Sequence, residues 1–220
     1  MDLDSTRSKF AYQHLINDFE ERHIDILVGT QMVTKGLDFD NVSVVGILSA
    51  DQMMNFPDFR SHERSFQIMS QVAGRAGRKN KGKVIVQTYA PSHPIIAHVV
   101  KHDFTKMYSE EIKHRKNFAY PPFHRLIELT VIHRDMDTVN LAADELVSKL
   151  KELLGKRVLG PEFALIPRIK NLYHKKILLK IAREESPAKV KKKIFELISR
   201  MQNNDAYKAV KVQADVDPIQ

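Results

Sequence analysis

The pattern of hydrophobic residues predicts two α/β domains in succession. In the first half, short apolar runs at residues 26–28, 42–48 and 83–89 read as strands. Between and around them, apolar residues recur at helical spacing. Helices are therefore predicted near residues 10–19, 31–35, 60–74, 95–102 and 104–117, with a loop over residues 50–59. Apolar strands separated by helices are typical of a parallel sheet that is covered on both faces.

The second half predicts a ferredoxin-like βαββαβ domain. Apolar and polar residues alternate over residues 125–133, and further strands are predicted at residues 163–169, 173–182 and 207–214. Amphipathic helices are predicted at residues 137–154 and 186–203, which gives the order of a split βαβ sheet. Pro121 and Pro122 cannot continue a helix. We therefore expect one domain over residues 1–118 and a second over residues 119–220, with the boundary near residues 118–123.

Composition narrows the range of functions. The 220 residues carry a net charge of +8 and include no cysteine, which excludes disulfides and thiolate chemistry. No apolar run approaches about 18 residues, and the acidic, polar start is unlike a signal peptide, so a cytoplasmic protein without a membrane partner is expected. Residues 119–220 hold +6 of the net charge. A polyanionic partner is therefore expected mainly on the second domain.

The segment with the clearest chemical pattern is Gln71-Val72-Ala73-Gly74-Arg75-Ala76-Gly77-Arg78. Glycine costs about 1 kcal/mol relative to alanine inside a helix, so two glycines here suggest close approach of a ligand to the backbone. Arg75 and Arg78 are three residues apart and can face one polyphosphate from a single helical turn. The alternative is a basic helix C-terminus that complements the helix dipole.

A second candidate segment, Gly29-Thr30-Gln31-Met32-Val33-Thr34-Lys35-Gly36-Leu37-Asp38-Phe39, follows a predicted strand. Ligands of open parallel sheets bind at the carboxyl ends of the strands. The hydroxyl and backbone N–H of Thr30 can donate hydrogen bonds to a phosphate. The Asp38 carboxylate can accept a hydrogen bond from a ribose hydroxyl. The alternative is an ordinary strand–turn–helix in which Asp38 is a cap.

Together, these two segments resemble motifs V and VI of superfamily 2 helicases. Further segments resemble the primosomal protein N′ (PriA) family of bacterial replication-restart helicases: the opening Met1-Asp2-Leu3-Asp4-Ser5-Thr6-Arg7, Ala50-Asp51, Asn55-Phe56-Pro57-Asp58-Phe59-Arg60-Ser61-His62-Glu63-Arg64, Tyr120-Pro121-Pro122-Phe123 and Asp215-Val216-Asp217-Pro218. The resemblance implies most of a second RecA-like helicase lobe, followed by that family's C-terminal domain.

The resemblance also implies roles for single residues. Arg78 would be the arginine finger for ATP, Arg75 its phosphate-contacting companion, and Gln71 would position water or phosphate. Thr30, with Gln31 and Lys35, would hold DNA, and Gly36 and Asp38 would couple the nucleotide state to that strand. The family moves 3′ to 5′ along single-stranded DNA at stalled or abandoned forks and assembles a primosome, with ATP and Mg²⁺ as cofactors.

Departures from the family pattern limit what this chain can do alone. It has no G-x-x-x-x-G-K-[ST] segment for ATP phosphates, and its one Asp-Glu pair, Asp144-Glu145, lies in an amphipathic helix. The family's zinc-binding cysteine-rich insert is absent. We therefore expect no ATP hydrolysis by the chain alone. A stand-alone module that binds single-stranded DNA or single-stranded-DNA-binding protein (SSB), and a RecG-like fork-remodelling helicase, are the alternatives.

The second domain offers two basic candidate surfaces. Basic side chains with an aromatic on a sheet suit single-stranded nucleic acid, which points to Arg168, Lys170, Tyr173, Lys175, Lys176 and Lys180. The alternative is a solvated sheet face. Lys189, Lys192 and Lys193 belong to a run that is either a solvated helix face or, as the resemblance implies, a dock for the acidic tail of SSB. His98 and His102 have no third ligand at metal-site spacing, so no metal site is expected.

Overall fold

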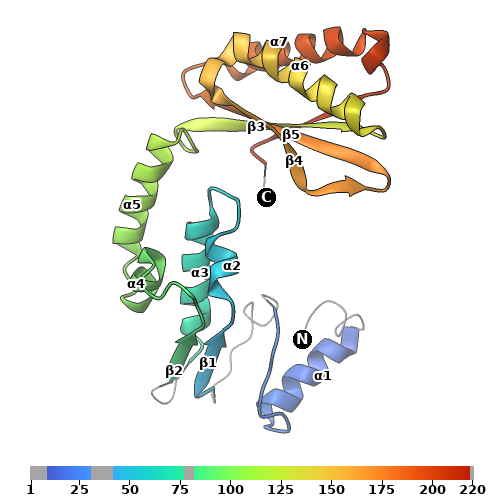
Figure 1. Ribbon diagram of the computed structural model, residues 1–220. Helices are drawn as coiled ribbons and strands as arrows, with labels where there is room; N and C mark the ends of the chain where they lie inside the picture. Colours follow the sequence, from blue (N-terminus) through green and yellow to red (C-terminus); the bar gives the residue numbers. More distant parts are fainter. Residues whose placement is uncertain (1–8, 31–41, 77–81, 219–220) are drawn as a thin grey trace. The chain divides into compact units, whose positions relative to one another are not determined.

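The computed structural model describes residues 9–30, 42–76 and 82–218 (Figure 1). The chain divides into two compact units, Met1–Glu111 and Ile112–Gln220. The division falls inside helix α5 (Phe104–Asn117), whereas the sequence places the boundary just after that helix; the exact domain limits stay a prediction.

In the first unit, two parallel strands are joined by helices. Strand β1 (Val44–Ile47) pairs with β2 (Lys83–Val86), and α2 (Ala50–Met54) and α3 (Ser61–Ala73) form the crossover that parallel pairing requires. Helix α1 (Lys9–Glu20) precedes the strands, and α4 (Pro94–Val100) and α5 follow them. The core joins β1 with α2, α3, α4 and α5 through Ile47, Ala50, Met54, Phe66, Met69, Ile95, Ile96, Val99 and Met107.

Three predictions for this unit are wrong. Residues 26–28 form no strand in the described structure, because no neighbouring strand pairs with them; Ile26 is 77% exposed. Residues 50–54 form helix α2 instead of a loop, since Ala50 and Met54 lie one turn apart and both enter the core. The parallel sheet is confirmed, but Val44 and Ile85 are exposed, so the described helices do not cover both of its faces.

The second unit confirms the ferredoxin-like fold. Its order is β3 (His124–His133), α6 (Met136–Leu154), β4 (Val158–Ile169), β5 (Leu172–Ala182), α7 (Pro187–Gln202) and β6 (Lys211–Val216). The strands form one antiparallel sheet in the spatial order β4-β5-β3-β6. Figure 1 shows α6 and α7 together on one face of this sheet.

Period-two alternation builds the core of the second unit. Ile127, Leu129 and Val131 of β3 and every second residue of β5 face the helices. The helices contribute Val139, Ala142, Ala143, Leu146, Val147, Leu150, Leu154, Ile194, Ile198 and Met201. None of the helices in the described part of the chain is long and apolar enough to cross a membrane.

Element ends in the second unit follow local chemistry. The Asp135 carboxylate accepts from the Thr138 amide at 2.8 Å, which caps α6, and Gly155 takes a positive φ of 61° at its end. Pro187 begins α7 as expected, although the side chain of Ser186 makes no capping hydrogen bond. Strand β4 begins five residues earlier than predicted, and β6 begins at Lys211 because residues Asp205–Tyr207 form a 3₁₀ turn.

We predict that Leu150→Ala lowers the free energy of unfolding by about 2–5 kcal/mol, because it opens a cavity between α6 and the sheet. Leu150 has no solvent exposure, whereas Leu141 on the same helix is 61% exposed. Leu141→Ala is therefore the matched control and should change stability by less than about 0.5 kcal/mol. Urea titrations followed by circular dichroism measure both changes. Equal effects would contradict the packing described here.

Candidate nucleotide and nucleic-acid sites

Helix α3 ends within the glycine- and arginine-containing segment, of which residues 71–76 are described, and the core holds this helix in place. Phe66 and Met69 are buried in the first unit's core. At the other end of the helix, the buried Asp58 carboxylate accepts from Arg64 Nη1 at 2.6 Å and from the Arg60 amide at 3.0 Å. This carboxylate ties the loop before α3 to the first turn of the helix.

The C-terminal end of α3 presents polar groups. Gln71 is exposed, and Arg75 is half-buried just beyond the last helical residue. The Arg75 amide donates to the Val72 carbonyl at 3.0 Å, so the chain keeps winding past Gly74. Gly74 has an ordinary φ of −66°, and a Cβ there would meet its nearest atoms at 3.5 Å. The fold itself therefore does not require glycine at this position, which fits close approach of a ligand to this helix end.

The remaining predicted nucleotide and motif residues divide into two groups. Thr30 is described and exposed. Gln31, Lys35, Gly36, Asp38 and Arg78 lie outside the described residues. Their roles stay predictions.

The sequence did not reveal a polar network at the carboxyl ends of β1 and β2. The Asp51 carboxylate accepts from the Thr88 hydroxyl at 2.9 Å and from the Tyr89 amide at 3.1 Å. Burial alone would raise the pKa of Asp51, but these hydrogen bonds outweigh burial and hold the pKa below its ordinary value. The network links α2 to the loop after β2, at the sheet edge where ligands of such folds bind.

The two histidines considered for a metal take different positions. His98 is buried, and its Nε2 lies 2.8 Å from Glu110 Oε2. His102 is exposed and follows α4. Across residues 9–30, 42–76 and 82–218, no group of three or more His, Cys, Asp or Glu side chains is placed to hold a metal ion.

The basic residues predicted on the second unit lie on both faces of its sheet. Lys176 and Lys180 alternate with Ile177, Leu179 and Ile181, so both lysines face away from α6 and α7. Tyr173 packs against the core on the helix side, and Lys175 shares that face. The six predicted residues therefore do not form one continuous surface.

Both lysines on the outer face have protein partners. Lys176 Nζ lies 2.8 Å from Glu128 Oε1. Lys180 is only 7% exposed; its Nζ donates to the Phe118 carbonyl at 2.7 Å and lies 3.7 Å from the centre of the Tyr120 ring. Burial lowers the pKa of Lys180. This ammonium thus holds the segment after α5 against the sheet.

The other predicted residues lie near the β4–β5 turn and stay accessible. The Arg168 guanidinium lies 5.2 Å from the Tyr173 ring centre, and Lys175 Nζ lies 5.2 Å from that of Phe163. Lys170 and Asn171 form the turn, with positive φ values of 49° and 63°. Cations resting on aromatic rings make a surface that suits phosphates and bases.

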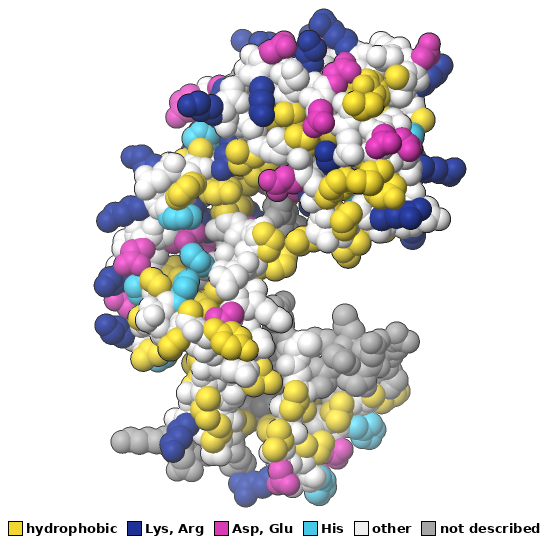
Figure 2. Space-filling model, viewed as in Figure 1, with side chains coloured by type: hydrophobic (Ala, Val, Ile, Leu, Met, Phe, Trp, Pro, Cys, Tyr) yellow, Lys and Arg dark blue, Asp and Glu magenta, His cyan; other side chains and the backbone are white. Residues whose placement is uncertain are grey.

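Helix α7 carries the third set of predicted residues. Lys189, Lys192 and Lys193 are all exposed, while Ile194 and Ile198 pack inward. Figure 2 shows Lys and Arg side chains over the outer surface formed by α6 and α7.

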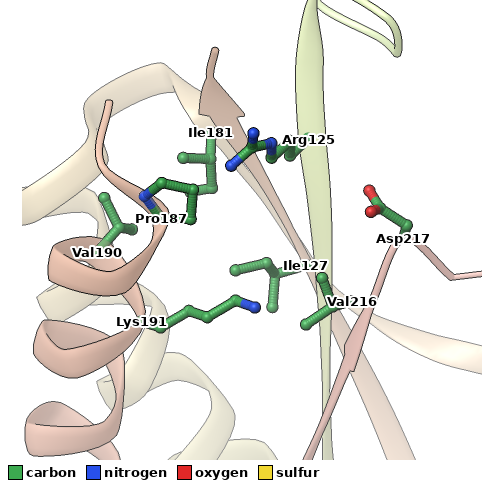
Figure 3. Close-up of a pocket in the computed structure, with 8 residues that line it drawn as sticks. All are labelled: Arg125, Ile127, Ile181, Pro187, Val190, Lys191, Val216 and Asp217. Atoms are coloured by element: carbon green, nitrogen blue, oxygen red, sulfur yellow. The ribbon is translucent and has the colours of Figure 1, made fainter. Parts of the chain in front are cut away.

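A pocket of about 180 Å³ lies beside the start of α7 (Figure 3). Aliphatic side chains form most of its wall, and two cations and one carboxylate stand at its rim. The lining residues are Arg125, Ile127, Ile181, Pro187, Val190, Lys191, Val216 and Asp217. Such a lining fits an apolar group attached to an anion.

Comparison with known proteins assigns both units. The Primosomal protein N C-terminal domain family matches residues 116–219, and the Helicase conserved C-terminal domain family matches residues 1–80. The replication restart protein PriA of Bacillus subtilis is 41% identical over 221 residues, which is 99% of this chain. The chain belongs to the PriA family. The PriA proteins of Synechocystis and Treponema pallidum are 41% and 35% identical, over 81% and 100% of the chain.

This chain corresponds to only part of its PriA relatives. It spans 27% of the Bacillus subtilis protein, 22% of the Synechocystis protein and 33% of the Treponema pallidum protein. The helicase-domain match confirms the RecA-like character of the first unit, and the PriA match covers nearly the whole second unit.

We predict that Lys180→Ala lowers the free energy of unfolding by about 1–3 kcal/mol, because it leaves the Phe118 carbonyl without its donor. The exposed Lys189→Ala is the control and should change stability by less than about 0.5 kcal/mol. Because the pKa of Lys180 is lower in the folded chain than in the unfolded chain, the unfolded chain binds more protons at alkaline pH. The contribution of Lys180 to the free energy of unfolding therefore rises as the pH increases toward 10.5. Urea titrations at pH 7.5 and pH 10 measure both effects. A Lys180 variant as stable as the Lys189 variant would contradict this assignment.

Proposed function

We propose that this chain is part of an ATP-dependent DNA helicase that acts at stalled or abandoned replication forks and restarts replication by assembling a primosome. The observation that carries the proposal is its relation to replication restart proteins along both units. The polar end of α3 supports it, because Gln71, Gly74 and Arg75 lie at or just beyond the end of a helix that the core holds in place.

The α3 end would act on ATP bound by another part of the longer protein. Arg78 would reach the γ-phosphate and stabilise the charge that develops in the transition state, with Arg75 as a second contact. Gln71 would orient water or phosphate. ATP hydrolysis would supply the energy for unwinding, with Mg²⁺ held by residues outside this chain. The chain alone is proposed to hydrolyse no ATP.

DNA would be held from both units. Thr30, Gln31 and Lys35 would contact the backbone of the single strand, while Gly36 and Asp38 would couple nucleotide state to that contact and drive movement 3′ to 5′. In the second unit, Arg168, Lys170, Tyr173 and Lys175 are the accessible candidates. Lys176 and Lys180 are weaker candidates, since each already contacts a protein group.

We predict that Arg78→Ala, in a full-length protein that carries this chain, lowers DNA-stimulated ATP turnover about 10³-fold, because it removes the arginine finger. Arg75→Ala should lower turnover about a hundredfold through loss of one phosphate contact. Single-turnover ATPase assays measure both, and fluorescence anisotropy with labelled single-stranded DNA checks that binding is retained.

Arg134→Ala is the matched control, since Arg134 is exposed in the turn after β3. Its ATP turnover should equal that of the wild type. Unchanged ATP turnover in Arg78→Ala would contradict its assignment as the arginine finger. Equal losses in all three variants would mean that the effect is not specific to the α3 end.

A second candidate function is binding of the acidic tail of single-stranded-DNA-binding protein on α7. The pocket beside this helix supports it, because an aliphatic floor lies next to Lys191 and close in sequence to Lys189, Lys192 and Lys193. A stand-alone binding module would use the same surface. A RecG-like fork remodeller is disfavoured by the PriA C-terminal match over residues 116–219.

We predict that replacing Lys189, Lys192 and Lys193 together by alanine weakens binding of a synthetic acidic-tail peptide about tenfold, because three exposed charge contacts are lost. Replacing Lys149, Lys151 and Lys156 removes the same charge from the end of α6 and its following turn, and should leave affinity within about twofold. Isothermal titration calorimetry at low salt measures the peptide affinity of both triple variants. Equal weakening would show that net charge, and not the α7 surface, attracts the peptide.

A further inference from the structure

Strand β4 loses its regular pairing with β5 near the hairpin end. Phe163 pairs with Lys175 and Arg168 pairs with Tyr173, so residues 164–167 of β4 lie opposite His174 alone. The extra residues form a bulge on an edge strand of the sheet. Among the described residues, β5 is the only strand that pairs with β4, so the outer edge of β4 has no strand partner there.

The bulge exposes aliphatic side chains. Leu165 is 76% exposed and Ile166 is 63% exposed, although they are neighbours in the chain and would alternate faces in a regular strand. Pro167 follows them and is also exposed. Figure 2 shows hydrophobic side chains open to solvent over this hairpin, with basic side chains beside them.

Basic residues lie on both sides of the aliphatic bulge, and one carboxylate, Glu162, precedes it in β4. Arg168 follows it directly, Lys170 lies in the turn, and Lys175 lies at its other border. Arg168 and Lys175 each rest over an aromatic ring and form no ion pair with a described carboxylate. The cations are thus held in place while their charge stays available to phosphates.

We propose that the bulge of β4 is a wedge for stacked DNA bases, with Leu165 and Ile166 entering a base step at a duplex junction. The flanking cations hold the phosphates on either side, and the aliphatic side chains replace the stacking that the bases lose. The inference rests on the proposed DNA binding and deepens it: the second unit takes a junction, not only a single strand. The cations around the bulge favour DNA over an apolar protein partner.

The test places 2-aminopurine at the first base pair of the duplex arm of a forked DNA, where its fluorescence rises on unstacking. Saturating amounts of the 220-residue chain should raise the signal. The double variant Leu165→Ser/Ile166→Ser should reduce that rise at least about fivefold and weaken fork binding about tenfold. Its affinity for single strands should change by less than about twofold.

Two controls separate the outcomes. Leu141→Ser removes an aliphatic side chain from α6 whose exposure, 61%, is close to the 63% of Ile166, and should leave the rise intact. Arg168→Glu/Lys175→Glu should lower affinity for both single-stranded and forked DNA. An undiminished rise in the serine variant, or an equal loss in Leu141→Ser, overturns the wedge. Fork binding by the wild type without any rise overturns the wedge and leaves DNA binding standing, whereas no binding to either DNA overturns both.

Discussion

The two-residue period of β5 governs most of the second unit. As an inner strand next to β3, it must bury one face under α6 and α7, and Ile177, Leu179 and Ile181 supply that face. The residues between them must then point to the opposite side. The same constraint that builds the core therefore determines where the lysines of this strand lie, and a shift by one residue would exchange core and surface.

Lys180 shows the consequence of that constraint. An ammonium so nearly buried is costly unless it is hydrogen-bonded, and the Phe118 carbonyl and the Tyr120 ring offset part of that cost, while burial still lowers the pKa of Lys180. The compensation comes from the segment that follows α5. Lys180, whose position in the sequence suggests a ligand-binding group, thus has a structural role. Arg168 and Lys175, which lie over aromatic rings near the hairpin end, remain accessible.

The first unit positions its chemistry by a different route. Parallel pairing of β1 with β2 requires a crossover, and α3 is the long helix of that crossover. Packing of Phe66 and Met69 sets the helix against the core, so Gln71 and Arg75 are presented at its end. Gly74 has an unstrained backbone conformation and room for a side chain, so the fold does not require glycine at this position. The helix end therefore has a local geometry suited to a ligand that approaches the backbone.

The sequence by itself determined the elements whose signal is local and periodic: α3, α6, α7, the strands β3 and β5 and the βαββαβ order, together with the PriA resemblance. It could not determine features that depend on distant partners. Residues 26–28 have a strand's composition, but no described strand pairs with them. Residues 50–54 become helical because Ala50 and Met54 meet a core formed by later segments. Only the tertiary structure separated tied lysines from accessible ones and revealed the bulge in β4. The physical reason is that composition sets which groups a strand carries, whereas burial, pairing and charge compensation are set by neighbours far away in the chain.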